Sequence, residues 1–90
     1  MNSKLIFSQA GVFRLQQLAS LIYRHTGVRH KLSSQRGQLD LLLDGTRSPH
    51  ADVRNCCAHL ADELHPHQLS ALRSEGVVLT PSTLVTEKAG

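Results

Sequence analysis

Apolar residues recur every three or four positions along most of the chain, which is the pattern of helices that bury one face. The first such stretch runs from about Ser8 to His25, with polar residues on the opposite face. Ser8 has the side chain of a helix N-cap, and Gly27 stands where a helix end favours a residue that tolerates positive φ. We therefore predict a helix here. Its inward positions are Val12, Leu15, Leu18, Ala19 and Ile22.

The segment 28–43 has two interpretations. In the first, a basic connector leads to a helix that Ser33 or Ser34 caps and that Gly45 ends. In the second, the two apolar runs of the segment are the arms of a β-hairpin around residues 33–37. The unbranched leucines favour the helix, because strands prefer β-branched and aromatic residues.

Two further helices are predicted in the second half of the chain. Ser48 as N-cap and Pro49 in the first turn predict the start of the third helix. Pro66 ends that run and opens a short fourth helix, which Gly76 closes. The β-branched run 77–81 then predicts an extended segment. The core positions expected in the last three helices are Leu39, Leu42, Leu43, Val53, Cys56, Leu60, Leu64, Leu69 and Leu72.

These elements predict an all-α fold, a compact bundle of three to four short helices with an extended C-terminal segment. Ninety residues fit one domain. We expect residues 1–81 to form a single helical domain and residues 82–90 to be a flexible tail.

The sequence also predicts the compartment. No apolar run approaches the ~18 residues that a membrane span needs, so we expect no membrane association. Cys56 and Cys57 are adjacent and cannot build a disulfide framework. A reducing compartment, the cytoplasm, is therefore expected. The acid-free N-terminal stretch also fits an organelle transit peptide, but removing it would take away the best-defined helix of the core.

Charge is distributed unevenly along the chain. Six cations and no carboxylate precede Asp40, whereas four cations and seven carboxylates follow from there to the end. The densest part of the basic half lies between residues 24 and 36. Such a stretch neutralises the phosphates of a polyanion, docks on an acidic protein surface, or is a solvated loop. The candidate residues for binding a polyanion or a protein partner are Arg24, Arg29, His30, Lys31 and Arg36.

We expect no metal, no cofactor and no catalytic site. Cys56, Cys57 and His59 share one helix, and His65 and His67 flank a proline, but adjacent cysteines point apart and no second cysteine pair exists. Cys57 and His59 face different sides of a helix, so they do not form a nucleophile pair. The sequence has no glycine-rich phosphate loop and no Gly-x-Ser-x-Gly motif.

One stretch resembles a known family. A leucine run that ends in Asp44 is followed by a short polar turn and by the helix-opening sequence Ser48-Pro49-His50-Ala51-Asp52-Val53-Arg54. Over residues 39–64 this order resembles a HEAT-type helical hairpin, in which the helix-opening proline, the aspartate and the Val-Arg pair recur. Such repeats stack in at least about three copies, and this chain contains one. The resemblance implies a helical scaffold that binds other proteins.

Three features of the sequence favour a function in protein interaction. They are the apolar faces of the predicted helices, the opposite charges of the two halves and the lack of catalytic motifs. We expect a non-catalytic helical module for protein interaction or regulation, acting on another protein or as a homodimer whose basic half meets the acidic half of its mate. The alternative is a nucleic-acid-binding regulator that uses the basic N-terminal half.

Overall fold

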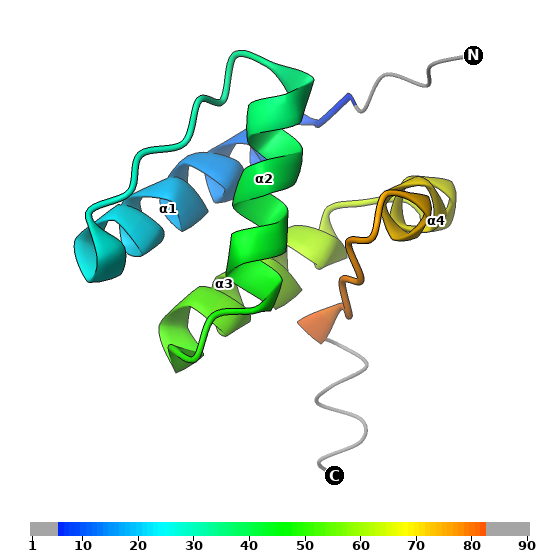
Figure 1. Ribbon diagram of the computed structural model, residues 1–90. Helices are drawn as coiled ribbons and strands as arrows, with labels where there is room; N and C mark the ends of the chain where they lie inside the picture. The colour runs from blue at the N-terminus through cyan, green and yellow to red at the C-terminus, as the bar shows by residue number, and fades with distance from the viewer. Residues whose placement is uncertain (1–5, 83–90) are drawn as a thin grey trace, which may run out of the picture.

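The computed structural model describes residues 6–82, and within this range the chain forms four α-helices and no β-strand (Figure 1). The helices are α1 (Gln9–Thr26), α2 (Gln35–Thr46), α3 (Ala51–Asp62) and α4 (Pro66–Ser74). The predicted all-α fold is confirmed. Of the two interpretations of segment 28–43, the helical one is right, because α2 occupies its second half.

Helix α1 begins and ends where its capping residues predict. The Ser8 hydroxyl accepts a hydrogen bond from the Gly11 amide at 3.2 Å. At the other end Gly27 adopts a φ of 76°, and its amide donates to the Tyr23 carbonyl at 2.8 Å. A glycine tolerates this left-handed conformation without strain. The two caps fix an 18-residue helix, about 27 Å long, as the longest element of the fold.

Residues 27–34, which we call the connector, lead from α1 to α2. Ser34 is the N-cap of α2, and its hydroxyl accepts from the Gly37 amide at 3.0 Å. Gly45 does not end α2 as predicted, because the helix continues through it to Thr46. A Cβ at Gly45 would lie 2.6 Å from the Cys57 sulfur. This glycine therefore permits a close approach between α2 and α3.

The predicted start of α3 is wrong by two residues. Ser48 is not the N-cap and Pro49 lies outside the helix, since α3 begins at Ala51 with His50 at the N-cap. The Ser48 hydroxyl instead accepts from the His50 amide at 3.1 Å, two residues along the chain. Serine hydroxyls form such local turns as readily as helix caps, and here the turn is formed.

Helix α4 follows the sequence signals closely. Pro66 is its first residue, where the missing amide costs no hydrogen bond, and the Gln68 side chain accepts from the His65 amide at 2.9 Å. Gly76 then turns the chain with a φ of 87°.

The segment after α4 runs back over the helices without forming a strand in the described residues, and Val77 and Leu79 are buried in the core. Its end is held by Asp62, which accepts hydrogen bonds from the amide and the hydroxyl of Ser82. The rest of the expected flexible tail 82–90 lies outside the described residues.

The core lies where α1, α2 and α3 meet. Most predicted core positions are buried, and Leu39, Leu43 and Leu69 pack against the core from its edge. Val12 is an exception, because its side chain is 42% exposed. At 100° per residue, Val12 lies about 60° around the helix from Leu15 and about 120° from Leu18, so it stands at the edge of the buried face. The buried hydrophobic residues are Leu15, Leu18, Ile22, Leu41, Leu42, Val53, Cys56, Cys57, Leu60, Ala61, Leu64, Leu72, Val77 and Leu79.

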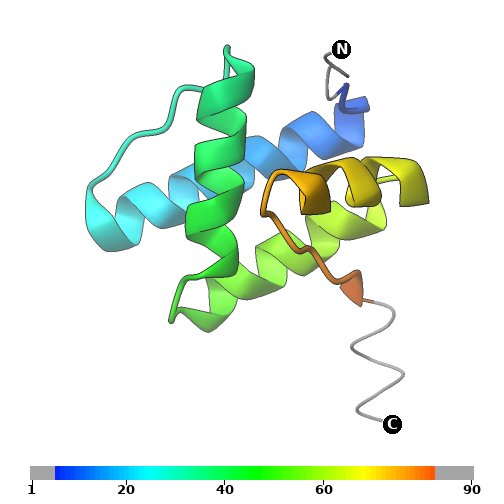
Figure 2. The ribbon, with the colours of Figure 1, turned by 45° about the vertical axis from the view of Figure 1, so that its right-hand side comes forward.

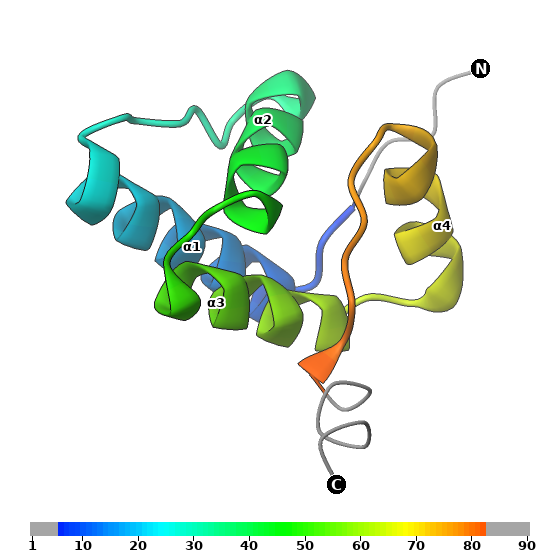
Figure 3. The same cartoon turned by 60° about the horizontal axis from the view of Figure 1, so that its bottom comes forward.

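The helices form two layers. α1 and α3 run side by side, and α2 crosses over both of them (Figures 2 and 3). α4 stands at one end of the molecule, where Gln68 donates a hydrogen bond to the Ile6 carbonyl at 2.6 Å. Within residues 6–82 no helix has the length and the apolarity that crossing a membrane requires.

Candidate functional site

The structure separates the five predicted binding residues. Arg24 lies in the last turn of α1, and Arg36 lies in the first turn of α2, where it pairs with Asp40 at 3.6 Å. Arg29 and Lys31 are exposed on the connector, as expected. Only Arg24 and Arg29 lie close to the same part of α1, beside Tyr23.

His30 is turned inward. Its side chain is only 6% exposed, and its Nε2 lies 2.7 Å from a carboxylate oxygen of Asp44 in α2. Its Nδ1 atom is buried without a hydrogen-bond partner. The contact fastens the connector to α2, so the role of His30 in the fold is positional and its ring is not available to a macromolecule at the surface.

Arg29 folds back onto α1. Its guanidinium carbon lies 4.6 Å from the centre of the Tyr23 ring, within the range of a cation–π contact. Arg29, His30 and Tyr23 line a shallow cavity of about 260 Å³ together with Ala19 and Ser20 of α1. The contact was not evident from the sequence, because the two residues belong to different elements.

Two histidines and an aspartate join the end of α1 to the start of α3. The Nε2 atom of His25 lies 3.0 Å and 3.1 Å from the two carboxylate oxygens of Asp52. The His50 ring stacks on the His25 ring with centroids 3.7 Å apart. A hydrogen bond from His25, with a second from the Val53 amide, holds the pKa of Asp52 below its ordinary value, against the opposing effect of burial. The cluster borders a cleft of about 380 Å³.

Replacing Asp52 with asparagine is expected to lower the free energy of unfolding at neutral pH. The difference in this free energy between the variant and the wild type should vanish at acid pH. On folding, the pKa of Asp52 falls below the ordinary value of an aspartate carboxyl. Such a carboxyl stabilises the folded state above its unfolded-state pKa and loses that contribution as the pH falls through its folded pKa. Urea unfolding of both proteins between about pH 7 and about pH 2 measures this. If the two proteins still differ by the same free energy of unfolding at about pH 2, the stabilising role of the Asp52 carboxylate is contradicted.

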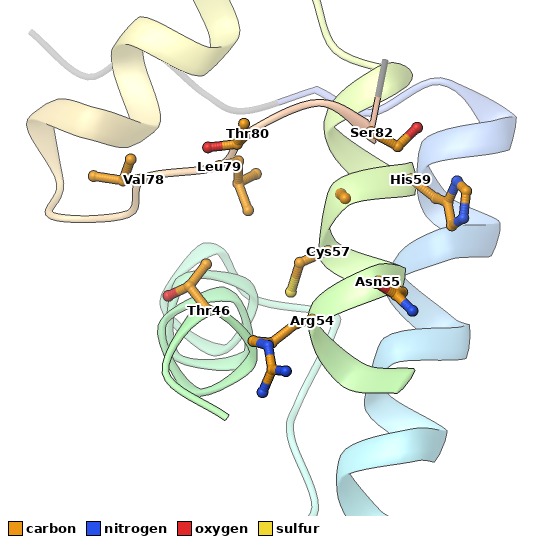
Figure 4. A pocket seen from close by; sticks show the side chains of 10 residues that line it. Thr46, Arg54, Asn55, Cys57, His59, Val78, Leu79, Thr80 and Ser82 are labelled. Atoms are coloured by element: carbon orange, nitrogen blue, oxygen red, sulfur yellow. The ribbon is translucent and has the colours of Figure 1, made fainter. Parts of the chain in front are cut away.

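A cavity of about 570 Å³ lies between α2, α3 and the segment that follows α4 (Figure 4). Cys57 points from α3 toward the side of α2, whereas His59 points away from it (Figure 4). Burial raises the pKa of Cys57 to about 12 and also raises the pKa of Cys56. The thiols therefore stay protonated at neutral pH, which makes them poor nucleophiles. In the described residues, no group of three or more His, Cys, Asp and Glu side chains could hold a metal ion.

The outward side of α1 carries a feature that the sequence interpretation missed. Phe13 is 59% exposed and Tyr23 is 44% exposed, although the chain has only three aromatic residues. Phe13 follows the buried Gly11 by two residues, which is a rotation of about 200° around the helix axis. Its side chain therefore faces away from the core. The signal was present, because Phe13 falls outside the three- and four-residue spacing of the core positions. We define the α1 outer face as Val12, Phe13, Gln16, Ser20 and Tyr23, all of them exposed.

No protein-family model, curated protein or solved structure matches this chain. The resemblance of residues 39–64 to a HEAT-type hairpin stays a prediction. Over that stretch the chain forms most of α2, a short turn and α3. The functional interpretation rests on the geometry of the described residues.

Proposed function

We propose that this chain is a non-catalytic protein-interaction module whose docking surface is the α1 outer face. The observation that carries the proposal is the exposure of Phe13 and Tyr23 on one helix. Aromatic side chains are enriched at the centres of protein interfaces, where they supply most of the binding energy. The fold does not need Phe13, since the helix buries its opposite side.

The flanks of the surface add to the proposal. Val12 lies beside Phe13 with a large exposed fraction, and Val28 of the connector is exposed beyond the end of the helix. The Arg29 guanidinium lies over one face of the Tyr23 ring. A rigid helix with exposed aromatic residues loses little conformational entropy when a partner covers it. We place this module in the cytoplasm, because its two buried cysteines are both free.

Co-purification tests the proposal with a matched pair of variants. Phe13→Ser is expected to reduce retention of the bound partner from cells that naturally make the protein by about 30-fold, the effect of losing an interface residue worth about 2 kcal/mol. Val78→Ser is the control, because Val78 is 57% exposed on a different element. Both variants should unfold within about 0.5 kcal/mol of the wild type. Equal retention by the two variants contradicts the proposal.

Nucleic-acid binding is the second candidate function, and one observation favours it. Arg24 and Arg29 are exposed beside Tyr23, and Lys31 is exposed further along the connector, in a part of the chain without a carboxylate. An aromatic ring among cations is typical of surfaces that bind single strands, although Arg29 covers one face of this ring.

The salt dependence of binding decides this second candidate. If Arg29 and Lys31 neutralise phosphates, the logarithm of the affinity for DNA or RNA falls with the logarithm of the salt concentration by about 0.7–0.9 for each phosphate contacted. Reversing both charges should then weaken binding without unfolding the exposed connector. A slope near zero, or no binding, removes this function.

A further inference from the structure

We infer that the partner segment bound by the α1 outer face is an amphipathic helix flanked by acidic residues. The inference rests on the proposed docking function and names the chemistry of its partner. It follows from the charges around the surface, from its length and from the absence of a matching surface elsewhere in the described chain.

The surroundings of the α1 outer face are cationic. Arg24 follows Tyr23 in the last turn of α1, and the Arg29 guanidinium lies over the Tyr23 ring. No aspartate or glutamate occurs anywhere in α1 or in the connector. A partner with carboxylates at its edges is therefore attracted, and a basic partner is repelled.

The carboxylates of α2 and α3 do not cancel the positive charge beside the α1 outer face. Asp40 pairs with Arg36 within α2, Asp44 lies against His30, and Asp52 lies against His25. All three belong to α2 or α3, the helices that pack on the core side of α1. The cations beside the aromatic residues thus remain available to the carboxylates of a partner.

The dimensions of the surface suit a helix. Phe13 and Tyr23 are ten residues apart, which is about 15 Å along the axis of α1, or roughly three turns of a partner helix. The exposed polar residues Gln16 and Ser20 lie between them on the α1 outer face. A partner helix that crosses there can place apolar side chains at i, i+3, i+4 and i+7 against both rings.

A second copy of the chain does not offer such a partner in its described part. Its described carboxylates lie in α2, in α3 and at the residues that follow α3 and α4, and none of the helices α2 to α4 exposes a large apolar side chain. Its own α1 outer face is apolar but has Arg24 and Arg29 beside it, so pairing two such faces would bring these cations toward their like-charged counterparts. Binding to the α1 outer face calls for a helix that carries both exposed apolar side chains and carboxylates. No helix in the described part of the chain carries both.

A displayed library of 16-residue helical peptides tests the inference. Every member carries leucine at four positions of one face, and the flanking positions are randomised among glutamate, lysine and glutamine. The library is selected for binding to the full chain at physiological ionic strength. The peptides that are retained should carry glutamate about ten times more often than lysine at the flanking positions. Reversing Arg24 and Arg29 to glutamate should weaken binding of the acidic peptides about tenfold. Reversing Arg47 and Arg73, both exposed, is the control with the same net charge.

The outcomes separate the two proposals. Peptides that depend on Phe13 but carry lysine or glutamine at their flanks overturn the inference and leave the docking function in place. Peptides retained equally by the wild type and Phe13→Ser, or no retained peptide, overturn the inference, and the co-purification experiment then decides the docking function by itself. A dimer in a sizing experiment that Phe13→Ser dissociates shows that the occupant is a second copy, which also overturns the inference.

Discussion

Replacing Leu18 with alanine is expected to lower the free energy of unfolding by about 3–5 kcal/mol, because Leu18 is fully buried where three helices meet. Its two methyl groups lie close to the position that a Cβ would take on Gly45, so the side chain fills the crossing of α1 and α2. The close approach of the helices leaves the backbone little freedom to collapse into the cavity. Urea unfolding followed by circular dichroism measures the change.

Val12→Ala is the control for this prediction. Both residues occur in the apolar stripe that the sequence predicts for α1, but Val12 is largely exposed in the structure. We expect this variant to lose less than about 1 kcal/mol. Equal losses from the two variants would contradict the orientation of α1 and, with it, the assignment of Phe13 to the outer face.

Replacing Gly37 with alanine is expected to cost about 2–3 kcal/mol, although alanine favours a helix over glycine by about 0.5–1 kcal/mol. A Cβ at Gly37 would overlap the carbonyl oxygen of Lys31. Because that oxygen belongs to the backbone, a side-chain rotation cannot relieve the clash. The connector would have to move, and the contact between Arg29 and Tyr23 would be disturbed with it.

Thermal unfolding measures this effect as a fall in Tm of about 10–20 °C, since 1 kcal/mol shifts the Tm of a domain of this size by about 4–8 °C. Arg36→Ala is the neighbouring control, because Arg36 is exposed and makes only a surface ion pair at 3.6 Å. It should cost no more than about 0.5 kcal/mol. A Gly37→Ala protein that is as stable as this control would show that the connector does not pack against the first turn of α2.

The sequence predicted the elements well where local chemistry determines them. Ser8, Ser34 and Pro66 occupy the helix starts for which their side chains are suited, and Gly27 and Gly76 adopt the positive φ that their positions require. The positions of these helix ends depend on hydrogen bonds between residues that are only a few positions apart in the chain. Ser48 shows the limit of such reasoning, because a serine hydroxyl can form either a helix cap or a local turn.

The sequence predicted the site less well, because its surfaces depend on packing between distant residues. His25 and Asp52 are 27 positions apart, and only the pairing of α1 with α3 brings them together. The spacing of apolar residues placed Val12 on the core side, yet α3 and α2 cover the opposite flank of α1. His30 belonged to the basic stretch by sequence, and its burial against Asp44 follows from the path of the connector.

Site-specific photo-cross-linking tests the central claim, that the α1 outer face is covered by a protein partner. The photoreactive residue p-benzoylphenylalanine replaces Phe13 in one protein and Val78 in the other, at sites of nearly equal exposure. Irradiation of cells that naturally make the protein should yield a discrete adduct with another protein from position 13, and little or none from position 78. No adduct from position 13, or the same adducts from both positions, would contradict the claim.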